Sequence, residues 1–266
     1  MTSPSATELH VTVRGRGKPL LLIHGSMTGD PELDDWQEQA ALADHYELRM
    51  VARRGYFISP DRLPSYGFEA ESDELAALLG DGMHVIGFSY GGFLALLMAA
   101  KRPDAVRSLT LIEPAALSIG RGNSDVEGLI ARIAPLHAAA PRMSAEQYLL
   151  AFRRALRGLP ADTALELTEQ DRHDLADPIM RRGIETARLE QPQWEATIPL
   201  DALAAASFPK LVVSGGWSPA FETICDTLDQ RLPAERAVIR GAGHPVQMIG
   251  ELFNERLLAF LRATPQ

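Results

Sequence analysis

The sequence predicts an α/β protein with a mainly parallel, doubly wound sheet and an inserted helical cap. Short apolar runs alternate with amphipathic segments in the first part of the chain, a pattern typical of strands joined by crossover helices. From about residue 115 to 208 the spacing is helical, and the alternation then resumes. We therefore expect a core domain of residues 1–115 and 209–266 and a helical cap of residues 116–208.

Size and composition limit the possible functions. The 266 residues can bury a core without disulfides or metals, and the single cysteine, Cys225, excludes an intrachain disulfide and fits a reducing compartment. The formal net charge of −9 argues against nucleic acid or an anionic membrane as a partner. The N-terminus has no basic or apolar export signal, and no segment has the length of a membrane span. We expect a cytoplasmic monomer or homodimer.

The first 86 residues should contain four strands. Residues 9–13 alternate in polarity, whereas residues 20–23, 48–52 and 84–86 are apolar runs of the kind found in parallel strands covered on both faces. Residues 34–43 and 73–79 have helical spacing. The basic turn at 14–19 lacks the GxxxxGK pattern of a phosphate site, so we interpret it as a hairpin loop.

The strand at 84–86 leads into the motif Gly-x-Ser-x-Gly at residues 87–91, followed by an apolar helix. Such a turn holds its serine in a strained conformation, and the glycines avoid collisions with the neighbouring strand and helix. Ser89 is therefore the candidate nucleophile. A serine that merely caps the helix is the alternative, but the order of strand, turn and helix favours the nucleophile.

The remaining elements complete the pattern. A strand at 106–112 ends at Glu113, and the cap follows with helical periodicity at 126–133, 146–156 and 178–189. The sheet resumes with a strand at 209–214, a helix at 220–232, a short strand at 237–239 and an amphipathic helix at 252–261. The GxGxxG motif of dinucleotide sites is absent.

Four motifs in this order resemble the α/β-hydrolase fold family over essentially the whole chain. They are the turn at 24–25, the turn at 54–56, the motif at 87–91 and the segment Gly-Ala-Gly-His at 241–244. The resemblance implies Ser89 as nucleophile, His244 as general base, and the backbone N–H groups of Ser26 and Tyr90 as the oxyanion hole. At residues 53–59 the chain departs from the family, whose usual turn has an Asp before the Arg and a second Gly.

Elementary chemistry supports the same roles. A serine hydroxyl is a weak nucleophile, so a neutral imidazole must accept its proton during attack and return it to the leaving group. Of the seven histidines, His244 fits best, because it follows a short strand and a glycine-rich turn near the C-terminus. His24 belongs to the oxyanion turn. The others are typical of surface or packing residues: His10, His45, His84, His137 and His173.

The acid departs from the commonest family pattern. Most members carry an Asp shortly after the strand that resumes the sheet, where this chain has Ser218. A serine cannot stay ionised beside an imidazolium. Glu113 ends the preceding strand and should point into the crevice where α/β sheets place ligands, so we expect it to orient His244. The alternatives are a solvated carboxylate at 113, or Glu222 and Asp226 as the acid.

The candidate substrate contacts are His24, Phe88 and Trp217. Four cap residues are further candidates for lining an apolar pocket, although core packing explains each of them more simply: Met143, Tyr148, Phe152 and Trp194.

The set of Ser, His and Glu predicts a cofactor-independent serine hydrolase that cleaves an ester, lactone or thioester of a small-to-medium, uncharged acyl compound. No ligand cluster indicates a metal. An epoxide or haloalkane hydrolase is disfavoured, because those reactions need a carboxylate at position 89. The alternative is a non-hydrolytic member of the same fold, either a cofactor-independent lyase or cyclase or a small-molecule receptor, because fold does not fix function.

Overall fold

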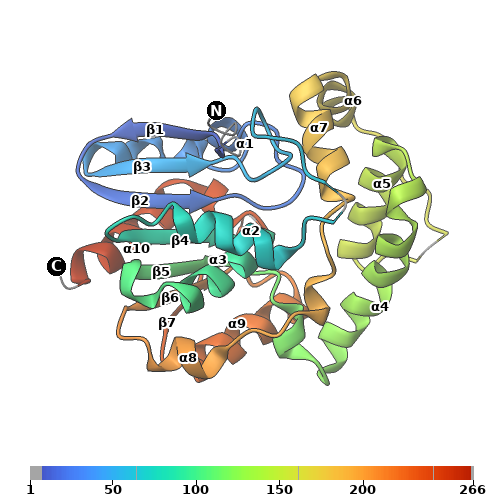
Figure 1. The fold of residues 1–266 in the computed structure, drawn as a ribbon. Helices are drawn as coiled ribbons and strands as arrows, with labels where there is room; N and C mark the ends of the chain where they lie inside the picture. Colours follow the sequence, from blue (N-terminus) through green and yellow to red (C-terminus); the bar gives the residue numbers. More distant parts are fainter. Residues whose placement is uncertain (1–7, 64, 161, 242, 265–266) are drawn as a thin grey trace.

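The sheet has seven strands in the order β1-β3-β2-β4-β5-β6-β7, and every neighbouring pair is parallel except β1 with β3 (Figure 1). This is the predicted α/β class. The computed structural model describes residues 8–63, 65–160, 162–241 and 243–264. The strands are β1 (Val11–Gly15), β2 (Lys18–Ile23), β3 (Tyr46–Val51), β4 (Met83–Phe88), β5 (Val106–Ile112), β6 (Lys210–Ser214) and β7 (Glu235–Val238).

Two hydrophobic cores cover the two faces of the sheet. Alternate residues of a strand point to opposite faces, so Leu21 and Val85 join one core whereas Leu22 and Ile86 join the other. The first core packs against α2 (Phe68–Ala77), α3 (Tyr90–Lys101), α8 (Leu200–Ala205) and α9 (Pro219–Arg231). The second packs against α10 (Glu251–Ala263) and the 3-10 segments η1 (Gln37–Asp44) and η6 (Val246–Ile249). The central strands are therefore mainly apolar on both faces, although His84, Ser108 and Thr110 are buried polar residues within them.

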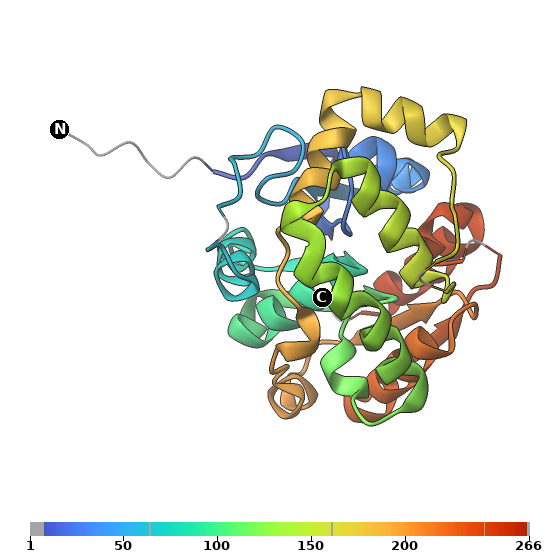
Figure 2. The ribbon, with the colours of Figure 1, turned by 90° about the vertical axis from the view of Figure 1, so that its right-hand side faces the viewer.

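Four helices lie beyond the carboxyl ends of the parallel strands (Figures 1 and 2). They are α4 (Ser124–Ala139), α5 (Ala145–Leu156), α6 (Glu169–Ala176) and α7 (Pro178–Ala187). A small core that includes Tyr148, Leu149 and Ile184 holds α5 against α7, whereas the buried residues of α4 join the first core and pack against α9. We call these four helices, together with the segment after α7 that carries Glu190 and Trp194, the cap. The division of the chain at 116 and 208 stays a prediction, and α8 packs with α3 and α9 of the sheet layer.

Two local predictions were wrong. Residues 34–43 do not form one helix, because α1 (Pro31–Asp34) ends there and the Asp34 and Asp35 carboxylates turn back to accept the N–H groups of Gly29 and Gly25. The turn at 14–19 is not a hairpin loop, because β3 lies between β1 and β2. In the described part of the chain, every helix is too short or too polar to cross a membrane.

The turn between β4 and α3 shows why its glycines are needed. Ser89 has φ 52° and ψ −118°, outside the regions that non-glycine residues favour. A Cβ on Gly91 would lie 2.3 Å from the carbonyl oxygen of His24 and 2.4 Å from that of Ile23, and one on Gly87 would lie 2.6 Å from the Gly91 oxygen. These contacts are with backbone, so no side-chain rotation relieves them.

This packing predicts the effect of Gly91→Ala on folding. The methyl group must displace α3 from the end of β2, so we expect a loss of about 1–3 kcal/mol in the free energy of unfolding, as in other overpacked interiors. Gly128→Ala in α4 is the control, because its Cβ would lie 3.6 Å from the nearest atom outside the helix backbone, and alanine should stabilise that helix by about 0.5–1 kcal/mol. Equal denaturation midpoints for Gly91→Ala and the wild type would contradict this account.

Candidate active site

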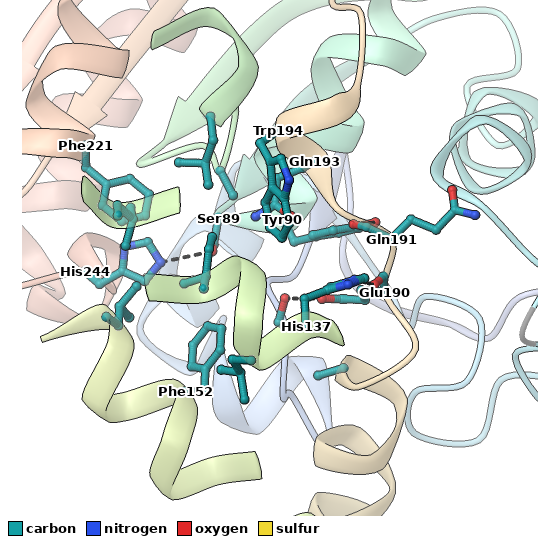
Figure 3. A pocket seen from close by; sticks show the side chains of 18 of the residues that line it. Ser89, Tyr90, His137, Phe152, Glu190, Gln191, Gln193, Trp194, Phe221 and His244 are labelled. Carbon is teal, nitrogen blue, oxygen red and sulfur yellow. Dashed lines mark hydrogen bonds between the residues drawn. The ribbon is translucent and has the colours of Figure 1, made fainter. Parts of the chain in front are cut away.

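Ser89, His244 and Glu113 form one chain of hydrogen bonds at the carboxyl edge of the sheet. His244 Nε2 lies 2.9 Å from Ser89 Oγ, and His244 Nδ1 lies 2.7 Å from Glu113 Oε2 (Figure 3 draws the first contact). Because an ionised carboxylate only accepts hydrogen bonds, Nδ1 carries the proton and Nε2 is left to accept the serine hydroxyl. This is the geometry of a serine nucleophile with a general base and an orienting acid.

The backbone on both sides holds Ser89 in its strained conformation. Its N–H donates to the carbonyl of Ile112 at 3.0 Å, and its carbonyl accepts the N–H of Ala115 at 2.9 Å. The segment after β5 therefore fixes the turn that follows β4. Strain of this kind persists only where the surrounding structure imposes it.

Glu113 is fully buried and has φ 39°. Its Oε1 accepts the N–H of Gly215 at 2.7 Å, and its Oε2 accepts Trp217 Nε1 at 2.7 Å in addition to His244. A buried carboxylate is costly unless it is hydrogen-bonded, and these three donors meet that requirement. The alternative of a solvated carboxylate at this position is therefore wrong.

The other candidate acids lie elsewhere. Glu222 accepts the Ser214 hydroxyl and the Gly216 N–H, each at 2.9 Å, and pairs with Arg236. Asp226 also pairs with Arg236. Glu222 thus holds the loop that supplies donors to Glu113. Ser218 precedes the first residue of α9.

Aromatic rings surround the imidazole of His244. The ring centroids of Phe221, Phe88 and Trp217 lie 4.6, 4.9 and 5.8 Å from it. Gly243, with φ 69°, turns the chain just before His244, whereas residue 242 lies outside the described residues. The rings restrict the movement of the imidazole, which keeps Nε2 directed at the serine.

The predicted oxyanion donors sit on two well-supported backbone segments. Tyr90 is the first residue of α3, where an N–H has no acceptor within the helix. Ser26 follows Gly25, whose N–H donates to Asp35 and whose carbonyl accepts Arg53 Nη2 and His24 Nδ1, both at 2.7 Å. Both Ser26 and Tyr90 line the pocket that contains Ser89. Their role in binding an oxyanion stays a prediction.

The three residues expected to contact substrate do not line this pocket. His24 is fully buried, and its Nε2 accepts the N–H of Arg53 at 3.0 Å. Burial, followed by the nearby Arg53 charge, lowers the pKa of His24 well below its usual value, so the ring is a neutral support of the turn. Phe88 and Trp217 pack against His244 instead. His24, Phe88 and Trp217 therefore support the turn and the imidazole outside the pocket. The sequence interpretation of these residues as substrate contacts is corrected accordingly.

A pocket of about 650 Å³, counting its open mouth, lies between the Ser89 turn and the cap (Figure 3). Its walls are mostly apolar, and Tyr148, Phe152 and Trp194 belong to them, whereas Met143 does not. The other large apolar side chains in the walls are Leu117, Leu129, Ile133, Leu136, Leu156 and Phe221. The polar side chains apart from the site residues are His137, Glu190, Gln191 and Gln193.

A buried charge cluster beside the pocket escaped the sequence analysis. Arg53 contacts Glu71 at 2.8 Å and Glu190 at 2.6 Å, and Arg62 contacts Glu71 at 2.6 Å. Tyr56 OH donates to Glu190 at 2.6 Å. Arg53 stands at the position where the family usually has an Asp, and this departure was the available signal. Its partner Glu190 could not be identified, because it lies far along the chain in the cap.

A metal site finds no support in the described residues, among which no group of three or more His, Cys, Asp or Glu side chains could hold an ion.

Known protein families and individual relatives were compared with this sequence, and the two comparisons agree. The sequence profile of the Alpha/beta hydrolase family matches residues 20–255. A pimeloyl-[acyl-carrier protein] methyl ester esterase of Aeromonas salmonicida is 28% identical over 235 residues, covering 85% of this chain and 87% of the relative.

Solved structures share the fold. A thermophilic esterase from Thermogutta terrifontis has a TM-score of 0.70 at 23% identity, over 97% of this chain and 94% of its own. A bromoperoxidase from Bacillus anthracis has a TM-score of 0.73 at 21% identity, over 96% and 95%. At such identities the structures establish the fold and nothing about the reaction.

The hydrogen-bond chain predicts that the reactivity of Ser89 depends on Glu113. Glu113→Gln places an amide beside His244 Nδ1 and removes the negative charge that stabilises the imidazolium, so labelling of Ser89 by a fluorophosphonate should slow by about 10²–10⁴. Asp226→Asn is the control and should label at the wild-type rate, because Asp226 pairs with Arg236. The rate constant for labelling of Ser89 is measured for both variants and for the wild type. A Glu113→Gln protein that labels as fast as the wild type would exclude Glu113 as the acid.

Proposed function

Because this chain belongs to the alpha/beta hydrolase family, we propose that it is a cofactor-independent serine hydrolase that cleaves a carboxylic ester, lactone or thioester through an acyl-enzyme on Ser89. The observation that carries the proposal is the continuous chain of hydrogen bonds from Ser89 through His244 to the buried Glu113 at the base of a pocket. A protein that only binds a ligand has no need of all three groups in this arrangement.

In the proposed reaction, His244 Nε2 takes the proton of Ser89 as Oγ attacks the acyl carbon. The carbonyl oxygen becomes an oxyanion and accepts the backbone N–H groups of Ser26 and Tyr90. The imidazolium, stabilised by Glu113, then protonates the departing alcohol or thiol. Water enters, gives a proton to Nε2 and attacks the acyl carbon, and the imidazolium returns the proton to Ser89 as the acid leaves.

The pocket supports an uncharged acyl group. Its walls are mainly aliphatic and aromatic, and the carboxylate of Glu190 is paired with Arg53. Transfer of an apolar chain into such a site is favourable, whereas a second charge would lose its hydration without a partner. The relative from Aeromonas salmonicida is named as an esterase, which agrees with hydrolysis of an ester.

The proposal predicts that Ser89→Ala abolishes turnover. Loss of the nucleophile should lower kcat by at least ~10⁴ for every substrate cleaved in a panel of p-nitrophenyl esters, lactones and thioesters. The wild type should be labelled by a fluorophosphonate at Ser89 alone, as read by peptide mass spectrometry. Retained turnover in Ser89→Ala, or a wild type that neither labels nor hydrolyses, would favour the lyase or receptor alternative.

The cap walls predict where acyl selectivity arises. Phe152→Ala removes a ring from the pocket wall, so kcat/KM for long esters relative to short ones should rise by about 10-fold, the value of a small change in an apolar pocket. Glu146→Ala on the exposed side of the same helix should leave the ratio unchanged. An unaltered ratio in Phe152→Ala would place the acyl group elsewhere.

A further inference from the structure

Glu190 follows the last turn of the cap helix α7, yet its carboxylate is buried against the core. Oε1 accepts Arg53 Nη2 and the Tyr56 hydroxyl, each at 2.6 Å, and Oε2 accepts the hydroxyl of Ser26 at 2.5 Å. Figure 3 shows Glu190 beside His137 of α4, whose Nε2 donates to the Glu190 carbonyl. Glu190 thus connects α4 and the end of α7 to the turn that carries Ser26.

Charge explains why this carboxylate stays in the core. Arg53 and Arg62 are buried together, and Glu71 and Glu190 are the two carboxylates that pair with them. Without Glu190 the cluster would hold two guanidinium groups and one carboxylate, and an uncompensated buried charge is strongly unfavourable. Arg53 therefore depends on the Glu190 carboxylate, which comes from the segment after α7, for one of its two buried ion pairs.

The same cluster orients the peptide group between Gly25 and Ser26. Arg53 Nη2 donates to both the Glu190 carboxylate and the Gly25 carbonyl. The peptide group is planar and trans, so its N–H, which belongs to Ser26, points away from the carbonyl that Arg53 holds. The side chain of Ser26 is also held, because its hydroxyl donates to the Glu190 carboxylate. The next residue, Met27, has φ 62°, so the turn depends on such supports.

Helix α7 also packs directly on this turn. A Cβ on Gly183 would lie 2.0 Å from the carbonyl oxygen of Thr28, and one on Gly29 would lie 2.4 Å from Met180 Sδ. Glycine at 183 thus lets the backbone of α7 lie directly against the carbonyl of Thr28.

The geometry points to Glu190 as a positioning residue of the oxyanion hole, which makes the hole competent only when the cap is seated. This inference rests on the proposed hydrolase function, because it assigns the Ser26 N–H to the developing oxyanion. Glu190 acts through Ser26 and Arg53 and takes no part in bond breaking.

Two variants test the inference. Ser26→Ala keeps the backbone N–H but removes the hydroxyl that Glu190 holds, and Glu190→Gln keeps the shape but removes the charge. We expect kcat for a cleaved ester to fall by about 10-fold in the first and about 10- to 100-fold in the second, with KM changed less than about threefold, because misplaced catalytic donors cost this much. The kcat of the double variant should resemble that of Glu190→Gln alone, because both substitutions disrupt the same hydrogen bond between Ser26 and Glu190.

An inhibitor separates positioning from mere structure. A trifluoromethyl ketone adds to Ser89 and forms an oxyanion, so its inhibition constant should rise in each variant by the factor lost from kcat/KM. Glu185→Gln is the matched control, because Glu185 lies on α7 and pairs with Arg181 at the surface, and it should match the wild type. Fluorophosphonate titration gives the folded, reactive fraction of each protein.

Each result decides the inference. Unchanged kcat and ketone affinity in Ser26→Ala and Glu190→Gln, with an active wild type, would overturn it and leave the hydrolase proposal intact. A raised KM with normal kcat would make Glu190 a substrate contact instead. If Glu190→Gln does not fold, Ser26→Ala decides. A wild type that neither hydrolyses nor labels would overturn this inference together with the function.

Discussion

Fully buried Glu113 accepts a hydrogen bond on Oε2 from His244 Nδ1 at 2.7 Å, and the rest of the site depends on this hydrogen bond. It selects the tautomer whose Nε2 can accept from Ser89. To keep an ionised carboxylate there, the chain must supply the N–H groups of Gly215 and Trp217. The loop that carries them is held in turn by Glu222. The carboxylate at the end of β5 is thus compensated by the segment after β6, its neighbour in the sheet.

A second constraint joins the cap to the core. Arg53 is buried just beyond the carboxyl end of β3. Its charge is paired with the carboxylates of Glu71 on α2 and Glu190 in the cap. Its guanidinium also holds the Gly25 carbonyl, so the ion cluster and the oxyanion turn are one structure. Because the apolar cap walls and the Glu190 carboxylate belong to the same inserted segment, the pocket and the donors around Ser89 are completed together when that segment packs on the core.

Local patterns explain how far the sequence could be interpreted. The β4-turn-α3 unit was predictable because glycine spacing and apolar runs are local consequences of steric crowding. The position of Glu113 beside His244 was predictable because parallel strands end at one edge of a sheet. Residues 34–43 were predicted as a helix because periodicity does not report where the Asp34 and Asp35 carboxylates turn back to bind Gly29 and Gly25. The contact between Arg53 and Glu190 joins residues distant in sequence, and no periodic pattern encodes such a pair. His24 was misassigned for the same reason, because its partner is the backbone of Arg53.

Rapid quenching during turnover tests the central claim most directly. If Ser89 is the nucleophile, acid-quenched protein from the first turnovers of a p-nitrophenyl ester should carry the mass of the acyl group, and peptide mapping should locate it on Ser89. The released nitrophenol should show a burst equal to the enzyme concentration when deacylation is the slower step. An acyl group on another residue would contradict the account. So would a burst equal to the enzyme concentration from protein that carries no acyl group when it is quenched.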